Sequence, residues 1–275
     1  LGAGIYYFGL RGNESTVTST DTETADILPG KASATLTLAD GKKIDLTNLR
    51  DTIINNEVRI VNGTVVYTST LAAPEMHEIS IPRKGYYELE LPDGSKAWIN
   101  SSSSVRYPSR FTGNERRVMV TGETYFEVAK DPSKPFRVGV RNMTVEALGT
   151  SFDINAYTDE STINTTLVEG AVKVYSGDAV LRLAPGQQSR LLAEGRLQLE
   201  DKVNIDEIIA WKDGLFHFER ADLASILRQF SRWYAVDIVY EGNVKPRKFF
   251  GIISRGSSLS DVLKMLEANY IRFKI

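Results

Sequence analysis

Residues 34–46, "ATLTLADGKKIDL", alternate apolar and polar side chains on both sides of a turn pair. Leu36 and Leu38 precede the pair Asp40-Gly41, and two further apolar residues follow it with the same spacing of two. A period of two is that of a half-buried strand, and an Asp-Gly pair supplies the positive φ that a tight hairpin turn requires. The stretch therefore predicts a β-hairpin.

The same pattern recurs about fifty residues later in residues 87–100, "YELELPDGSKAWIN", around the pair Asp93-Gly94. Further short strands are predicted at 118–120, 126–128, 136–140, 144–148, 152–157, 165–168, 171–175, 180–183, 189–192 and 197–199. No stretch between residues 34 and 200 has a long helical period. Many short strands separated by turns are typical of a β sandwich, here expected to be jelly-roll-like, over residues 27–203.

The pattern changes near residue 204. Asn204 is a candidate N-cap for a short helix, and residues 221–234 and 257–268 carry the apolar stripe of amphipathic helices. Ser258 and Asp261 form a capping-box pattern at the start of the second stripe. Strands are predicted at 215–219, 236–241, 248–254 and 271–275. Residues 204–275 are therefore expected to form a small α+β domain in the order β-α-β-β-α-β.

Composition narrows the classes of function. The 275 residues carry a net charge of −2 and no cysteine, which excludes disulfides and thiolate metal sites and gives no basis for nucleic-acid binding. Residues 1–10, "LGAGIYYFGL", are apolar with aromatic residues before Arg11, as at the distal end of a membrane-spanning helix. Ten residues are too few to cross a bilayer, which takes about 20. We expect residues 1–26 to be the remnant of a membrane helix and a polar linker; the alternative is a disordered arm.

Candidates for catalysis or metal binding are few. His77 and His217 are the only histidines, and both are interpreted as structural, His77 on a strand surface and His217 on the face opposite Phe216 and Phe218. The run Ser101–Ser104 lacks a nucleophile-elbow context and is expected to be a solvated loop. We predict no catalytic, cofactor-binding or metal-binding residues and no enzyme activity. The alternative that remains is a glycosidase whose two catalytic carboxylates lie far apart in the sequence.

Several ordered stretches resemble one protein family. Residues 91–138, "LPDGSKAWINSSSSVRYPSRFTGNERRVMVTGETYFEVAKDPSKPFRV", resemble the central signature of FecR-family anti-sigma regulators of the type common in Bacteroidetes. "VEALGTSFDINAY" (145–157), "TTLVEGAVKV" (165–174) and "LAPGQQ" (183–188) continue the resemblance in order. Residues 211–241 resemble the small C-terminal domain of that group, which is similar to the secretin/TonB short N-terminal fold.

The resemblance implies a single-pass inner-membrane protein with this region in the periplasm. It implies two partners: an extracytoplasmic-function sigma factor, bound by a cytoplasmic segment outside this sequence, and the periplasmic signalling domain of an outer-membrane TonB-dependent, SusC-like transducer. The expected function is relay of a signal between them. A carbohydrate-binding or cell-envelope adhesion β-module is the alternative, and a glycosidase comes third.

The candidate partner surface is the strand at 248–254 with its basic approach. The residues singled out are Lys245, Arg247, Lys248, Phe250, Ile252 and Arg255. Basic residues often guard a free strand edge, and Gly251 is tolerated better in an exposed strand than in a central one. The competing interpretation is that the basic residues are a solvated face and that Phe249, Phe250, Ile252 and Ile253 fill the core.

Overall fold

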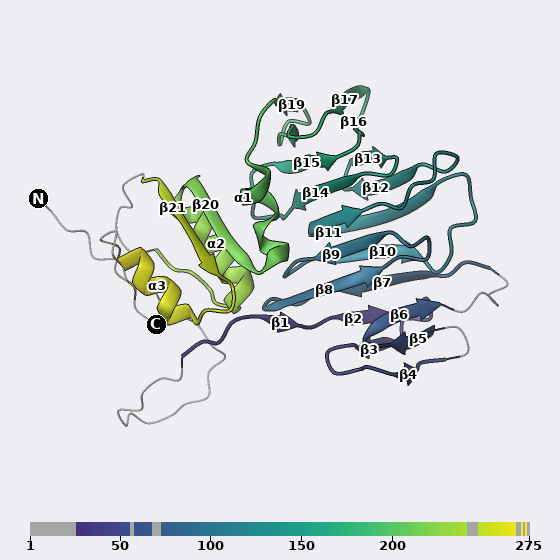
Figure 1. The fold of residues 1–275 in the computed structure, drawn as a ribbon, viewed down its shortest axis with the longest axis horizontal. Coiled ribbons are helices and arrows are strands. Elements are labelled where there is room, and N and C mark those ends of the chain that lie inside the picture. Colours follow the sequence, from purple (N-terminus) through teal and green to yellow (C-terminus); the bar gives the residue numbers. More distant parts are fainter. Residues whose placement is uncertain are drawn as a thin grey trace, which may run out of the picture.

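A computed structural model describes residues 26–55, 58–67, 73–240, 247–267, 271 and 273. Figure 1 shows a large β part and a smaller part with helices beside it. The strands of the β part are β1 Lys31–Ala32, β2 Thr35–Thr37, β3 Lys43–Asp45, β4 Thr52–Ile53, β5 Val58–Val61, β6 Thr64–Tyr67, β7 Met76–Ser80, β8 Gly85–Glu90, β9 Lys96–Ile99, β10 Ser104–Pro108, β11 Arg116–Glu127, β12 Phe136–Val140, β13 Met143–Ala147, β14 Ser151–Ala156, β15 Ile163–Glu169, β16 Val172–Ser176, β17 Ala179–Leu183, β18 Gln188–Leu191 and β19 Leu197–Glu200.

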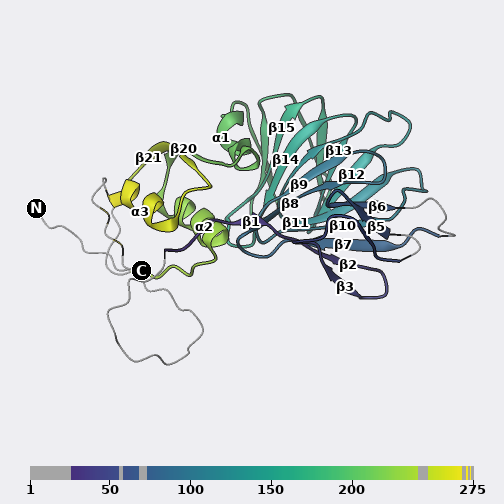
Figure 2. The same cartoon turned by 60° about the horizontal axis from the view of Figure 1, so that its bottom comes forward.

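Two layers of this β part share one strand. The first runs in the order β17-β16-β13-β12-β11-β10-β7-β2-β3, and the second joins β8, β9, β11, β14, β15, β18 and β19. Apolar side chains from both layers form one continuous core that includes Leu36, Leu89, Phe126 and Val145. Figure 2 shows the stacked strands from a second direction. The mainly β fold with a sandwich is thus confirmed, and its two predicted hairpins form as β2-β3 and β8-β9.

The shared strand β11 differs from the prediction, which placed separate strands at 118–120 and 126–128. Its first half pairs with β10 and β12, and its second half pairs with β9 and β14. The change of pairing partners along β11 occurs at Gly122, which has φ +72°. A Cβ there would lie 2.2 Å from Ser103 Oγ, so the crossing between layers requires glycine.

A three-stranded sheet, β4-β5-β6, was not predicted. Its hairpin turns at Asn62-Gly63, where both residues have positive φ. This is the local signal for a tight hairpin turn, and it was available in the sequence.

The smaller part contains α1 Ile205–Ile209, the 3-10 helix η1 Ala210–Asp213, β20 Leu215–Ala221, α2 Leu223–Tyr234, β21 Phe249–Ser254 and α3 Leu259–Glu267. Asn204 caps α1 by accepting from Glu207 N, as predicted. A second core gathers the apolar faces of α2, α3 and the pair β20-β21. The small helical C-terminal part is therefore confirmed (Figure 1).

One predicted strand of this part is absent. Residues 236–240 form no strand, and the carbonyl of Val236 accepts from the side chains of Ser231 and Arg83. The predicted strand at 271–275 lies mostly outside the described residues, although Ile271 and Phe273 pack on the second core. The boundary at 203/204 stays a prediction; the two cores lie on either side of it. Within the described residues, no helix has the length and apolarity needed to cross a membrane.

Candidate functional site: the junction between the two cores

Buried charged side chains gather where the sandwich meets the C-terminal part. Glu123 on β11 and Asp153 on β14 come from the sandwich, and Arg232 on α2 and Arg255 after β21 come from the C-terminal part. Burying a charge is costly unless it is paired and hydrogen-bonded. Such a set is therefore a candidate functional site. We call this region the junction.

Arg255 is the central cation of the junction. Its Nη1 donates to Trp211 O at 3.0 Å, and its Nη2 donates to Asn100 Oδ1 at 2.9 Å. The guanidinium also lies 3.7 Å from the ring centroid of Trp233. The side chain is only 5% exposed, so the prediction that Arg255 belongs to a partner-binding surface is wrong: its hydrogen bonds hold it inside the molecule.

Glu123 is the buried anion that faces this cation. It accepts from Asn100 Nδ2 at 2.5 Å and from Asn155 Nδ2 at 2.7 Å. Burial raises the pKa of Glu123, while these hydrogen bonds and the charges of Arg232 and Arg255 act in the opposite direction. Asn100 therefore bridges Glu123 and Arg255 with one amide.

The serine run lies beneath this bridge. Ser101 donates to Gly85 O at 2.6 Å, and Ser103 Oγ accepts from Glu123 N at 2.9 Å. Tyr157 donates to Ser101 O at 2.7 Å. Ser101 and Ser103 are buried, whereas Ser102 is exposed. The expectation of a solvated loop is therefore wrong for Ser101 and Ser103, whose hydroxyls bond backbone groups of β8 and β11.

Arg232 makes the second charged contact across the junction. Its Nη1 donates to both oxygens of Asp159 at 2.9 and 2.8 Å, and its Nη2 donates to Glu160 Oε1 at 3.1 Å. Its guanidinium stacks on the ring of Tyr157 at 3.8 Å. Arg228, one turn earlier on α2, donates to Glu160 Oε2 at 2.6 Å. The helix is thus fixed to the sandwich by two arginines.

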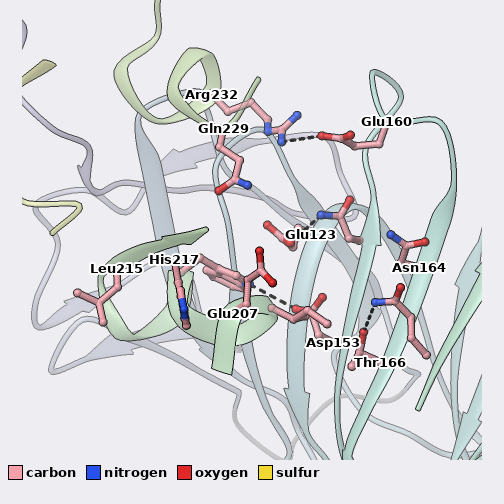
Figure 3. A pocket seen from close by; sticks show the side chains of 14 residues that line it. Glu123, Asp153, Glu160, Asn164, Thr166, Glu207, Leu215, His217, Gln229 and Arg232 are labelled. Carbon is pink, nitrogen blue, oxygen red and sulfur yellow. Dashed lines mark hydrogen bonds and ion pairs between the residues drawn. The ribbon is translucent and has the colours of Figure 1, made fainter. Parts of the chain in front are cut away.

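A polar pocket of about 190 Å³ lies inside the junction (Figure 3). Its walls come from both parts and comprise Glu123, Asp153, Asn155, Glu160, Asn164, Thr166, Gln188, Glu207, Ile208, Trp211, Leu215, His217, Gln229 and Arg232. Burial, with the nearby charge of Glu123, raises the pKa of Asp153 well above its ordinary value. Trp211 Nε1 donates to Asp153 Oδ1 at 3.4 Å. Among the described residues, no three side chains are grouped so as to hold a metal ion.

Four of the predicted partner residues lie outside the junction, at or just before β21. Phe250 and Ile252 are 68% and 62% exposed, whereas Phe249 and Ile253 point into the core. Arg247 and Lys248 are exposed just before β21, and Lys245 lies outside the described residues. Within the described residues β21 pairs only with β20.

The two histidines lie in different environments. His77 is buried, stacked 5.3 Å from the ring of Tyr67, so its placement on a strand surface is wrong. Tyr67 belongs to β6, in the β4-β5-β6 sheet that the sequence interpretation missed. His217 lies on the face of β20 opposite Phe216 and Phe218, as predicted, and lines the pocket.

Sequence reasoning did not find Glu123, Asp153 and Arg232. Asp153 stands between two apolar residues in "SFDINAY", and Arg232 stands beside the apolar stripe of its helix. The signal available in the sequence is a charged residue beside positions that are expected to be buried. The residues that pair with this charge are far away in the sequence, so the pattern alone does not identify them.

Comparison with known proteins agrees with this architecture. The family model described as "FecR protein" matches residues 77–173, and "FecR, C-terminal" matches residues 215–275. A crystal structure of a protein described as an anti-sigma factor from Parabacteroides distasonis ATCC 8503 is similar, with 30% identity and a TM-score of 0.64 over 70% of this chain and 91% of that one. A second structure of that description has 27% identity and a TM-score of 0.62 over the same shares. No curated protein matches.

The matched segments contain the elements that build the junction. The first includes Asn100, Glu123 and Asp153, and the second includes Arg232 and Arg255. The chain belongs to the FecR family of anti-sigma factors.

Proposed function

We propose that this chain is the periplasmic part of a single-pass inner-membrane anti-sigma factor. It relays a signal from the signalling domain of an outer-membrane TonB-dependent transducer to an extracytoplasmic-function sigma factor. Membership of the FecR family supports a sigma factor as partner. The apolar stretch at residues 1–10 supports attachment to the membrane.

The observation that carries the transducer contact is the exposed face of β21. Phe250 and Ile252 lie on it two residues apart, and both are largely exposed. Large apolar side chains that lie exposed and next to one another are candidates for an interaction surface. A partner strand added along such an edge would gain backbone hydrogen bonds, and its own side chains would pack beside Phe250 and Ile252 on the same face of the sheet.

The junction supports the relay itself. β21 leads within a few residues to Arg255, whose side chain reaches Asn100 in the sandwich. A partner bound on β21 is therefore close in the chain to the contact that holds the two parts together. A relay requires that the partner bind two arrangements of the molecule with different affinity.

The test is the affinity of the chain for the periplasmic signalling domain of a TonB-dependent transducer from the same organism, measured by calorimetry. Phe250→Ser with Ile252→Ser should weaken binding at least about tenfold, because burial of each apolar side chain contributes about 1.5 kcal/mol or more. The matched control is Ile53→Ser with Val66→Ser, which removes two exposed apolar side chains from the β4-β5-β6 sheet. Equal affinity for both double variants and the wild type would refute the β21 surface.

A further inference from the structure

Residues 26–33, here called the strap, touch both parts of the molecule. Asp26 accepts from Ser260 N at 3.2 Å and from Ser260 Oγ at 2.6 Å. Ile27 O accepts from Leu259 N at 2.9 Å. The first N–H groups of a helix have no partners within the helix. The strap therefore caps α3, although more than 230 residues separate the two in the sequence.

The middle of the strap lies against the tryptophan that supports the junction. A Cβ on Gly30 would come within 2.7–2.8 Å of three ring atoms of Trp233, so the backbone of the strap lies directly on the ring. The same indole donates from Nε1 to Arg255 O at 2.8 Å and carries the guanidinium of Arg255 on its face. The strap and Arg255 therefore share one support.

The end of the strap belongs to the sandwich. Lys31 and Ala32 pair in parallel with Gly85 and Tyr86 of β8. Lys31 N donates to Lys84 O at 3.0 Å, and Lys84 N donates to Arg232 O, in α2, at 2.8 Å. The residues that hold the strap thus also hold the C-terminal part. Departure of the C-terminal part would remove the partners of Asp26, Ile27 and Gly30 together.

We propose that the strap is a clasp whose closure is coupled to the closure of the junction. Its two ends bind different parts of the molecule, so it is fully bonded only when those parts are docked. Opening of the junction loosens the strap, and opening of the strap loosens the junction, by the same factor in each direction. What this coupling means for signalling rests on the proposed function, because the strap follows directly on residues 1–25.

The first arm weakens the junction and observes the strap. Asp159→Asn with Glu160→Gln removes the ion pairs of Arg232, and that of Arg228 with Glu160, without touching the strap. Hydrogen exchange is followed by NMR at the amides of Lys31 and Ser33, which bond to β8 and its approach. We expect exchange at least about fivefold faster, the effect of roughly one lost ion pair. Glu194→Gln, in an exposed pair with Arg196, is the control and should leave these amides unchanged.

The second arm displaces the strap and observes the junction. Gly30→Leu cannot fit against Trp233, whereas Gly113→Leu, the control, meets no atom within 4 Å of the new Cβ. Exchange of the Trp211 indole N–H, which faces Asp153, should become at least about fivefold faster only in Gly30→Leu. Asp26→Ala, which removes one helix cap, is a milder second variant if Gly30→Leu fails to fold.

Faster exchange in both arms supports the clasp. Unchanged strap amides in Asp159→Asn/Glu160→Gln would overturn it, whether or not the Trp211 indole responds. An unchanged indole in both strap variants would overturn it equally. The transducer domain is absent from both arms, so failure of the clasp and failure of the β21 surface are separate results.

Discussion

Arg255 donates from Nη2 to Oδ1 of Asn100 at 2.9 Å, and both side chains are buried although 155 residues separate them. Asn100 in turn donates to Glu123. A cation from the C-terminal part and an anion of the sandwich therefore meet through one amide. Each is costly to bury without the other, which makes the docked arrangement depend on all three.

Removal of Arg255 should uncouple the two parts. Arg255→Ala takes the donor Nη2 from Asn100 Oδ1 and leaves Arg232 as the remaining nearby cation of Glu123. Breaking a buried charged contact costs about 3–5 kcal/mol. Calorimetry should show a lower first unfolding transition, separate from that of the sandwich. Arg255→Lys keeps the charge but not both hydrogen bonds and should be intermediate. Arg182→Ala, on an exposed strand position, is the control; an Arg255→Ala protein as stable as this control would contradict the prediction.

Stability should depend on pH through Asp153. Burial raises its pKa above the ordinary value of 3.8, so the folded chain holds this proton more tightly than the unfolded chain. The resulting stabilisation is complete below that ordinary value and is lost as pH rises through the folded pKa. Asp153→Asn removes this loss, which is at most about 1.4 kcal/mol per pH unit.

The measurement is urea unfolding from about pH 4 to about pH 8, taken as wild type minus variant. The difference matters because the pKa values of Asp26 and Glu115 are lowered by hydrogen bonds and act in the opposite direction. Asp178→Asn, in an exposed turn, should follow the wild-type profile. Parallel profiles for wild type and Asp153→Asn would show that Asp153 does not titrate abnormally.

His77 should make the chain less stable in acid. Burial lowers its pKa, so the folded chain stays neutral at His77 while the unfolded chain takes up a proton. Stability from this residue is therefore present above about pH 6.5 and falls as pH drops through that value. His77→Phe keeps the stacking on Tyr67. In this variant the free energy of unfolding should depend less on pH between about pH 7.5 and about pH 5 than in the wild type. Met76→Thr, the exposed neighbour, should keep the wild-type dependence; identical slopes in both variants would reject the idea.

Gly122 should tolerate no side chain. Gly122→Ala places a Cβ on Ser103 and strains a positive φ, whereas Gly94→Ala strains a similar φ in open space. We expect about 1 kcal/mol of destabilisation for Gly94→Ala and about 3 kcal/mol for Gly122→Ala. Denaturant unfolding of both variants measures the difference, and equal losses would mean that the crossing of β11 adapts.

Charge reversal before β21 should slow partner binding. Arg247→Glu with Lys248→Glu changes the sign of an exposed basic approach, so the association rate for an acidic partner surface should fall at low salt and recover at high salt. Lys42→Glu with Lys43→Glu, in an exposed hairpin turn, is the charge-matched control. A wild-type association rate of the Arg247/Lys248 variant at low salt would remove this basic approach from the docking site.

Local features were predictable from the sequence because their causes are local. The hairpins at Gly41 and Gly94 follow from side-chain alternation and from residues that accept positive φ. The caps at Asn204 and Ser258 follow from side chains three residues from their partners. The hairpin at Asn62-Gly63 carries the same local signal in the sequence, although it was not predicted. The family resemblance likewise rested on ordered stretches of sequence.

The orientation of β21 could not be predicted. In "KFFGIIS" apolar residues occupy both odd and even positions, so both faces of the strand are apolar and the alternation does not indicate which face is buried. The second core selects Phe249 and Ile253, and this leaves Phe250 and Ile252 exposed. Arg255, one position after the strand, then turns inward toward the sandwich instead of outward with the other basic residues.

The sequence by itself determined that a β sandwich precedes a small α+β part, because periodicity, turn residues and caps act over a few residues. Only the tertiary structure decided that β11 crosses between two layers, that Ser101 and Ser103 are buried, and that Glu123 meets Arg255 through Asn100. Those features depend on which distant residues share one low-dielectric space. A buried charge is stable only beside its partner, and that partner is identified by the packing of the two parts.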